Sequence, residues 1–199
     1  MTYHVTIEPR TLHFKQPAGT SRGIYTTRQS WFITLTSPEQ PDRKGVGECA
    51  PLPDLSCDAI PEYERILYSV CNMFGLTGKI NHDMLRPYPS ILFGLETALL
   101  SFESGSDVLF DTPFARGEEG IPINGLVWMG SYDEMLARLE YKMKTGFRCV
   151  KLKIGAIDFD KELDLIRHIR SAFTKEQIEL RVDANGGFTP DNAMERLEK

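Results

Sequence analysis

The chain has 199 residues, of which 41% are hydrophobic and 26% are charged, proportions that are typical of one or two globular domains. A formal net charge of -5 argues against nucleic acid as a partner, because proteins that bind nucleic acid present basic surfaces. No stretch approaches the roughly 20 apolar residues of a membrane-spanning helix, and the first residues lack the apolar segment of a secretory signal, so we expect no membrane partner.

The N-terminal part reads as strands followed by helices. Alternating residues predict strands near 4–7, 31–35 and 45–49, with a turn-rich loop over residues 16–23. Apolar side chains at helical spacing then predict a helix from about Tyr63 that Gly75 can end, and a second helix that begins after Pro89. We therefore expect an α+β domain over residues 1–110.

The pattern changes to alternating strands and helices over residues 119–199. Strands are expected at 121–128, 149–154 and 178–184. A capping box at Ser131 and Glu134 opens one helix, residues 159–173 form the next, and Thr189 with Pro190 begins a third. This order predicts the first three units of a β/α barrel. A barrel needs eight strands, so we expect a truncated chain whose active site lacks the C-terminal barrel half.

Polar side chains share one face of two of these strands. Alternation places Lys151 and Lys153 on one side of their strand, and Asp183 with Asn185 on one side of the next. In a β/α barrel the inward polar groups at the carboxyl ends of the strands build the active site. We therefore expect Lys153 and Asp183 to lie at the same mouth.

This set of side chains suits proton abstraction assisted by a metal ion. A carboxylate favours a hard cation such as Mg²⁺, and a second ammonium nearby favours the neutral form that a lysine base needs. A metal and a base together can remove a proton α to a carboxylate. The alternatives are structural: paired lysines also keep exposed strands soluble, and Asp183-Ala184-Asn185-Gly186 is also a common turn sequence.

The two motifs together resemble a known family. Lys151-Leu152-Lys153 followed by Asp183-Ala184-Asn185 is similar to the KxK and DxN strands of the muconate-lactonizing branch of the enolase superfamily. The upstream segments over residues 47–53 and 93–96 resemble those of its o-succinylbenzoate synthases.

That resemblance implies an α+β capping domain over an enolase-like barrel. It implies that Lys153 is the general base, that Lys151 binds the substrate carboxylate, and that Asp183 is a Mg²⁺ ligand with Asn185 in support. The remaining metal ligands and an opposing lysine would lie on later strands. Segments around residues 19–23 and 52–53 resemble loops that close over the substrate, so Arg22, Leu52 and Pro53 are candidate contacts. Ordinary surface turns are the alternative for these loops.

The implied reaction is the Mg²⁺-dependent dehydration of 2-succinyl-6-hydroxy-2,4-cyclohexadiene-1-carboxylate to 2-succinylbenzoate in menaquinone biosynthesis. The substrate is a small anionic carboxylate. The four cysteines are far apart and form no CxxC pair, so we interpret them as reduced thiols in a cytoplasmic protein. Two alternatives stay open: an N-acylamino acid racemase or dipeptide epimerase of the same superfamily, and a non-catalytic fragment or binding module.

Overall fold

The structure is a computed structural model that describes residues 1–20, 23–155 and 157–199. The chain divides into two compact units. One contains Met1–Ala18 and Tyr25–Gly120, and the other contains Gly19–Ile24 and Ile121–Lys199. Each unit has its own hydrophobic core.

The first unit is built on a three-stranded sheet in the order β1-β2-β3. Its strands are β1 (His4–Thr20), β2 (Gly23–Ser37) and β3 (Gln40–Cys49), and β2 pairs antiparallel with β3. The strands are longer than their apolar alternation predicts. Residues 16–20, predicted as part of a turn, belong to β1, because a neighbouring strand gives their backbone groups hydrogen-bonding partners.

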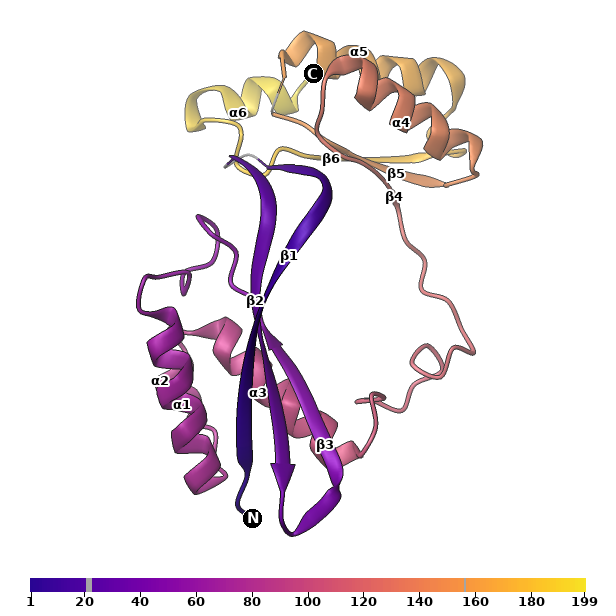
Figure 1. The fold of residues 1–199 in the computed structure, drawn as a ribbon. Coiled ribbons are helices and arrows are strands. Elements are labelled where there is room, and N and C mark those ends of the chain that lie inside the picture. The colour runs from indigo at the N-terminus through magenta and orange to yellow at the C-terminus, as the bar shows by residue number, and fades with distance from the viewer. Residues whose placement is uncertain (21–22, 156) are drawn as a thin grey trace. The chain divides into compact units, whose positions relative to one another are not determined.

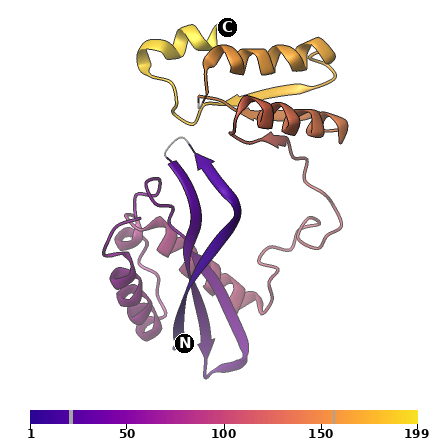
Figure 2. The same cartoon turned by 45° about the horizontal axis from the view of Figure 1, so that its top comes forward.

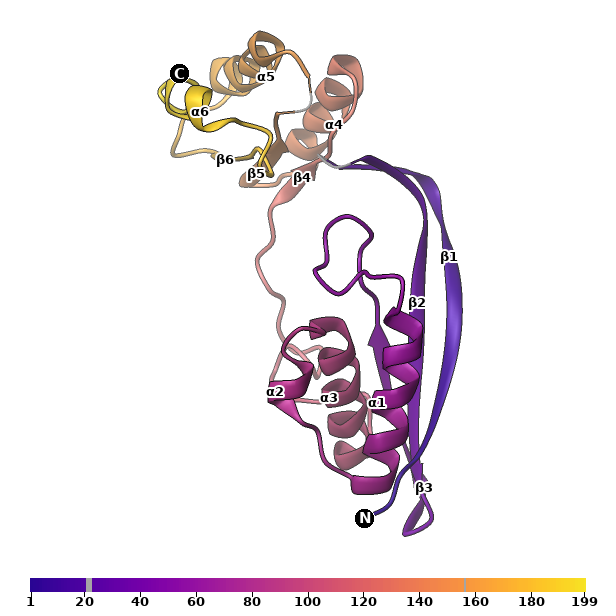
Figure 3. The same cartoon turned by 90° about the vertical axis from the view of Figure 1, so that its left-hand side faces the viewer.

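Three helices cover one face of this sheet: α1 (Tyr63–Thr77), α2 (His82–Leu85) and α3 (Pro89–Ser104) (Figures 1 and 3). Helix α3 packs directly on β3. A Cβ atom added at Gly45 would lie 2.1 Å from the Ala98 carbonyl oxygen, and one at Gly47 would lie 1.9 Å from that of Gly94. Glycine is therefore required at both β3 positions by the close approach of the helix backbone.

The prediction that Gly75 ends the first helix is wrong. Helix α1 continues to Thr77, and Gly78 supplies the left-handed C-cap with φ 62°. A Cβ atom added at Gly75 would lie 3.0 Å from the Tyr3 carbonyl oxygen. Gly75 therefore serves the close packing of α1 on the start of β1.

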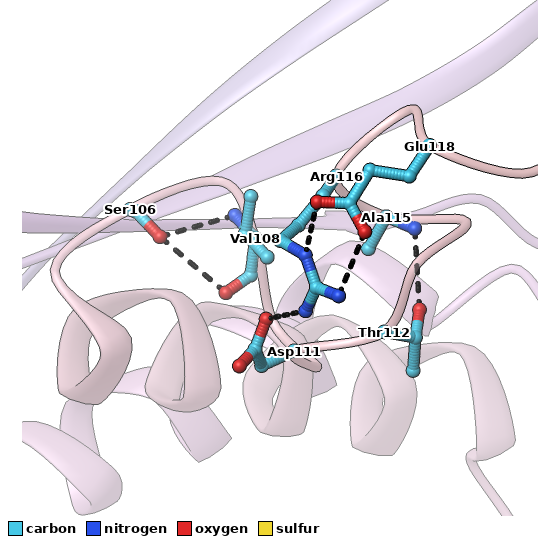
Figure 4. A network of polar contacts seen from close by, with 7 residues as sticks. All are labelled: Ser106, Val108, Asp111, Thr112, Ala115, Arg116 and Glu118. Atoms are coloured by element: carbon cyan, nitrogen blue, oxygen red, sulfur yellow. Dashed lines mark hydrogen bonds and ion pairs between the residues drawn. The ribbon is translucent and has the colours of Figure 1, made fainter.

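The segment after α3 has no regular secondary structure but holds itself together locally (Figure 4). Arg116 donates to both carboxylate oxygens of Glu118, at 2.8 and 2.9 Å, and also pairs with Asp111. The bidentate geometry orients the guanidinium, although all three side chains are well exposed. Exposure to solvent keeps the contribution of such pairs to stability small.

The second unit alternates strand and helix. Its elements are β4 (Gly125–Val127), α4 (Tyr132–Lys144), β5 (Cys149–Lys153), α5 (Phe159–Ala172), β6 (Glu179–Asp183) and α6 (Pro190–Leu197). The strands are parallel in the order β4-β5-β6. The observed antiparallel sheet followed by parallel β/α units agrees with the predicted fold class.

Helices α4 and α5 lie on the same face of this parallel sheet (Figure 2). Their apolar side chains meet the alternate strand residues in one core, formed by Val127, Met135, Leu139, Val150, Leu152, Ile154, Leu165, Ile169 and Ile178. The predicted alternation is therefore confirmed for β5, since Val150 and Leu152 are fully buried while Lys151 and Lys153 point away from this core.

Local signals placed the helix starts well. Ser131 and Glu134 form a reciprocal capping box at the start of α4, and Pro190 occupies the first turn of α6. The first strand was predicted too long, because only Gly125–Val127 pairs with β5. Ile121 and Ile123 are exposed instead, so apolar character alone did not mark the strand boundary.

Among the helices of the described residues, none combines the length and apolar character that a membrane span requires.

Candidate functional site

The polar ends of β5 and β6 meet at one edge of the parallel sheet. The register pairs Lys153 with Asp183, and Lys151 with Arg181. The Ile154 backbone N–H donates to the Asp183 carbonyl oxygen at 3.0 Å, one residue past the end of β5. The pairing therefore aligns the carboxyl ends of both strands, as the sequence predicted.

Both lysines converge on a single carboxylate oxygen. The Lys151 Nζ lies 2.7 Å from Asp183 Oδ2, and the Lys153 Nζ lies 2.8 Å from the same atom. Lys153 also donates to the Asn185 Oδ1 at 2.5 Å. The side chains of Lys151, Lys153 and Asp183 are 31%, 19% and 26% exposed, so the cluster is partly withdrawn from water yet accessible to a small molecule.

The charges of this cluster act on Asp183. The hydrogen bonds from Lys151 and then from Lys153 hold the pKa of its carboxyl well below the usual range, against the smaller opposing effect of burial. The carboxylate is therefore ionised throughout the physiological range. The sequence placed these residues at one mouth, but it did not predict that one oxygen would hold both ammonium groups.

The backbone after β6 turns sharply to aim Asn185. Asn185 has φ 49°, a left-handed conformation that asparagine tolerates better than most residues, and Gly186 follows with φ 73°. The Asn185 backbone N–H donates to the Asp183 Oδ1 at 3.0 Å. This turn brings the Asn185 amide oxygen to Lys153, so four of the predicted site residues lie together.

The donor atoms suit a hard cation but do not complete a site for one. Asp183 offers carboxylate oxygens and Asn185 offers an amide oxygen, which are ligand types that Mg²⁺ accepts. Within the residues that the structure describes, no group of three or more acidic, histidine or cysteine side chains is placed to hold a metal. The role of Asp183 as a metal ligand, with Asn185 in support, therefore stays a prediction.

The other predicted contacts belong to a different part of the chain. Leu52 and Pro53 lie in the exposed loop between β3 and α1, within the first unit. The Ser56 hydroxyl accepts from the Leu52 backbone N–H at 2.9 Å, and the Tyr25 hydroxyl donates to the Pro53 carbonyl oxygen at 3.3 Å. Arg22 lies outside the described residues. Their part in substrate binding stays a prediction.

Sequence reasoning missed a buried acid beside the site. Glu162 is only 1% exposed, and its Oε1 accepts from the backbone N–H groups of Gly155 and Ile157, just beyond β5. The available signal was its spacing: residue 162 shares a helix face with the buried Leu165 and Ile169. A charged residue on the apolar face of an amphipathic helix marks a specific contact.

Two family matches cover most of the chain. Residues 20–102 match the family described as the MenC N-terminal domain. Residues 134–199 match the family described as enolase C-terminal domain-like, and this match includes the lysines and Asp183. The first match lies almost entirely in the antiparallel unit and the second lies in the parallel β/α unit.

The curated relatives are longer than this chain. The o-succinylbenzoate synthase of Desulfotalea psychrophila is 36% identical over 94% of this chain, which spans 59% of that relative. The crystal structure of MenC from the same organism superposes with a TM-score of 0.77 at 30% identity. The superposition covers 99% of this chain and 61% of the MenC chain.

More distant structures share the fold. The substrate-liganded L-Ala-D/L-Glu epimerase from Bacillus subtilis has a TM-score of 0.70 at 22% identity, over 100% of this chain and 57% of its own. The o-succinylbenzoate synthase from Thermosynechococcus elongatus, complexed with Mg in its active site, has a TM-score of 0.66 at 20% identity. This superposition covers 100% of this chain and 56% of the synthase chain. The chain therefore carries a segment of the MenC N-terminal domain family followed by a segment of the enolase C-terminal domain-like family, in the same order as in the o-succinylbenzoate synthase relative that it matches.

Proposed function

We propose that the chain forms part of an o-succinylbenzoate synthase, a lyase that dehydrates 2-succinyl-6-hydroxy-2,4-cyclohexadiene-1-carboxylate. In this proposal residues 1–110 form the capping domain, and residues 119–199 supply the first three units of the barrel. The remaining units would complete the site, because this chain spans 59% of the Desulfotalea psychrophila relative.

One observation carries the proposal: Lys151 and Lys153 both reach one carboxylate oxygen at 2.7 and 2.8 Å. Two ammonium groups that converge on a single anion make a receptor for a carboxylate, since charge-assisted hydrogen bonds are short and strong. A substrate carboxylate of the same shape can take the place of Asp183 on these lysines. That exchange frees the Asp183 oxygens for a cation.

The proposed reaction moves one proton and expels one hydroxyl group. Lys153 acts in its neutral form, after its ammonium has lost a proton to solvent. The neutral Lys153 Nζ accepts the proton from the ring carbon that carries the carboxylate, the C–O bond on the neighbouring ring carbon breaks, and the same proton leaves with the hydroxyl as water. Lys151 holds the substrate carboxylate, and Asn185 orients Lys153 through its amide oxygen. A Mg²⁺ ion held by Asp183 would stabilise the negative charge that develops on the carboxylate oxygens. Leu52, Pro53 and Arg22 are proposed to contact the rest of the substrate.

Loss of the Lys153 base provides the test. In the protein that carries all its β/α units, we expect Lys153→Arg to fold but to lower the rate of 2-succinylbenzoate formation by about 10²–10⁴-fold, because a guanidinium does not give up its proton. Lys161→Arg, at an exposed position of α5, is the matched control and should retain activity. Circular dichroism checks folding. Near-normal turnover by Lys153→Arg would exclude Lys153 as the base.

A second candidate function is dipeptide epimerisation, favoured by the epimerase structure that superposes over the whole chain. Epimerisation also begins with removal of a proton α to a carboxyl group, so the same lysines suit it. The two reactions are distinguished by assaying both substrates with the same preparation. Epimerisation without dehydration would replace the first proposal, and the absence of both activities in the folded, unsubstituted protein would favour a non-catalytic binding module.

A further inference from the structure

Glu162 holds backbone groups immediately after the strand that carries the lysines. Its Oε1 accepts from Gly155 N–H at 2.7 Å and from Ile157 N–H at 3.3 Å. Burial of a carboxylate is unfavourable unless donors compensate the charge, and these two N–H groups together with the positive N-terminal end of α5 supply that compensation. Glu162 thereby connects α5 to a backbone position two residues beyond Lys153.

The backbone at Gly155 also touches the turn after β6. A Cβ atom added at Gly187 would lie 3.0 Å from the Gly155 carbonyl oxygen and 3.2 Å from its Cα. Gly155 itself has φ 88°, which favours glycine. The Gly187 N–H donates to the Ala184 carbonyl oxygen at 2.8 Å, within the same turn that carries Asn185. The two glycines therefore bring the segments after β5 and β6 into direct backbone contact.

We propose that Glu162 is a positioning residue for the candidate site. Its carboxylate fixes Gly155 and Ile157, Gly155 rests against Gly187, and this contact keeps Asn185 within hydrogen-bond distance of Lys153. The catalytic meaning of the inference rests on the proposed function, but the arrangement belongs to this chain and is independent of substrate and metal.

Stability alone does not require a charge at this position. A buried charge is weak evidence for stability, because the desolvation of the charge opposes the hydrogen bonds that it accepts. An apolar residue, however, accepts no hydrogen bond, and the Gly155 and Ile157 N–H groups would lose their acceptor. The effect on the local backbone after β5 can therefore be measured separately from the effect on the stability of the whole unit.

The experiment compares Glu162→Leu with Glu162→Gln by NMR and amide hydrogen exchange, in the protein that carries all its β/α units. Glutamine keeps an acceptor oxygen, so we expect signals close to wild type. Leucine removes it, so we expect exchange at Gly155 to become about tenfold faster, or more, as a local opening while Leu165 and Ile169 in the α5 core keep their rates. The side-chain amide signal of Asn185 should shift only in Glu162→Leu.

Asp164→Leu is the matched control, because Asp164 is an exposed acid on the same helix, and it should leave Gly155 and Asn185 unchanged. Uniformly faster exchange in Glu162→Leu, including Ile169, would mean a merely structural role and overturn the inference. Unchanged Gly155 and Asn185 signals would overturn it as well.

Gly187→Ala keeps the inference testable if Glu162→Leu does not fold. The added methyl group disturbs the same contact from the β6 side, so Gly155 and Asn185 should shift together. A shift of only one of these two signals, Gly155 or Asn185, in Gly187→Ala would overturn the inference. Because no substrate or metal is used, failure here leaves the proposed function standing, and an inactive enzyme would not alter this result.

Discussion

At the scale of single residues, burial divides the cysteines into two classes. Cys49 and Cys71 lie in the core of the first unit, where burial raises the pKa of each thiol to about 12. Cys57 is exposed and Cys149 is partly exposed. Since the thiolate is the reactive form, position in the fold determines which cysteines react.

We predict that iodoacetamide at about pH 8 modifies Cys57 rapidly and leaves Cys49 and Cys71 unmodified in the folded chain. A thiol with a pKa of about 12 is ionised at roughly one part in ten thousand at that pH, and its burial also blocks the reagent. Peptide mass spectrometry after timed labelling provides the measurement, with urea-unfolded chain as the control in which all four cysteines react. Equal labelling of Cys57 and Cys71 in the folded chain would contradict the prediction.

The site residues show what the sequence predicts well at this scale. Strand alternation placed Lys151, Lys153 and Asp183 on one side because side-chain direction in a strand has a strict period of two. The shared oxygen of Asp183 and the contact made by Glu162 depend on side-chain rotamers and on backbone approach between two loops. Neither leaves a periodic signal in the sequence.

At the scale of elements, short-range chemistry was more informative than apolar runs. The Ser131 hydroxyl accepts from the Glu134 N–H at 3.4 Å, and the Glu134 carboxylate accepts in return from the Ser131 N–H at 2.9 Å. Such caps act within four residues and are readable from the sequence. The lengths of β1 and β4 could not be predicted from the sequence, because pairing with other strands determines them.

The capping box of α4 gives a prediction about pH. The backbone and side-chain hydrogen bonds from Ser131 lower the pKa of Glu134 from 4.5. Its stabilising contribution is therefore fully present above about pH 4.5 and is lost as the pH falls through the lower pKa of the folded state. Glutamine at this position keeps an acceptor but does not titrate.

We expect wild type to melt at a higher temperature than Glu134→Gln at neutral pH, and this difference to shrink as the pH falls toward about 3. Melting followed by circular dichroism across that range measures the effect. Glu140→Gln, at an exposed position of the same helix, should show a smaller pH dependence. A difference between wild type and Glu134→Gln that does not vary with pH would mean that the carboxylate charge does not stabilise the cap.

A buried carboxylate connects the loop before α1 to α3, although no motif predicted this contact. Asp58 is only 1% exposed, and its Oδ2 accepts from the Ser90 backbone N–H at 2.8 Å and from the Ser90 hydroxyl at 2.5 Å. The loop is thereby attached to the first turn of α3, where backbone N–H groups lack helical partners. Sequence distance hides this contact, since 32 positions separate the two residues.

At the scale of the whole molecule, the parallel sheet of the second unit is open. Among the described residues, β4 and β6 each pair only with β5, so each presents a free edge (Figure 1). Apolar side chains remain exposed on β6 and α6: Val182 of β6 is 44% exposed, and Met194 and Leu197 of α6 are 67% and 65% exposed. Parallel sheets are normally covered on both faces, and a closed barrel has no edges.

These open edges predict that the 199-residue chain by itself associates in solution and does not stay a monomer. Unpaired strand edges and exposed apolar side chains favour association, so we expect size-exclusion chromatography with light scattering to report oligomers or aggregates that grow with protein concentration. Val182→Lys should reduce this association, because a charge beside an edge strand opposes pairing with another chain. Leu76→Lys is the matched control: Leu76 is 84% exposed on α1 of the first unit, and its replacement should leave association unchanged. A compact monomer with a single cooperative melt at high concentration would contradict the prediction, and it would mean that three β/α units suffice to cover their own sheet.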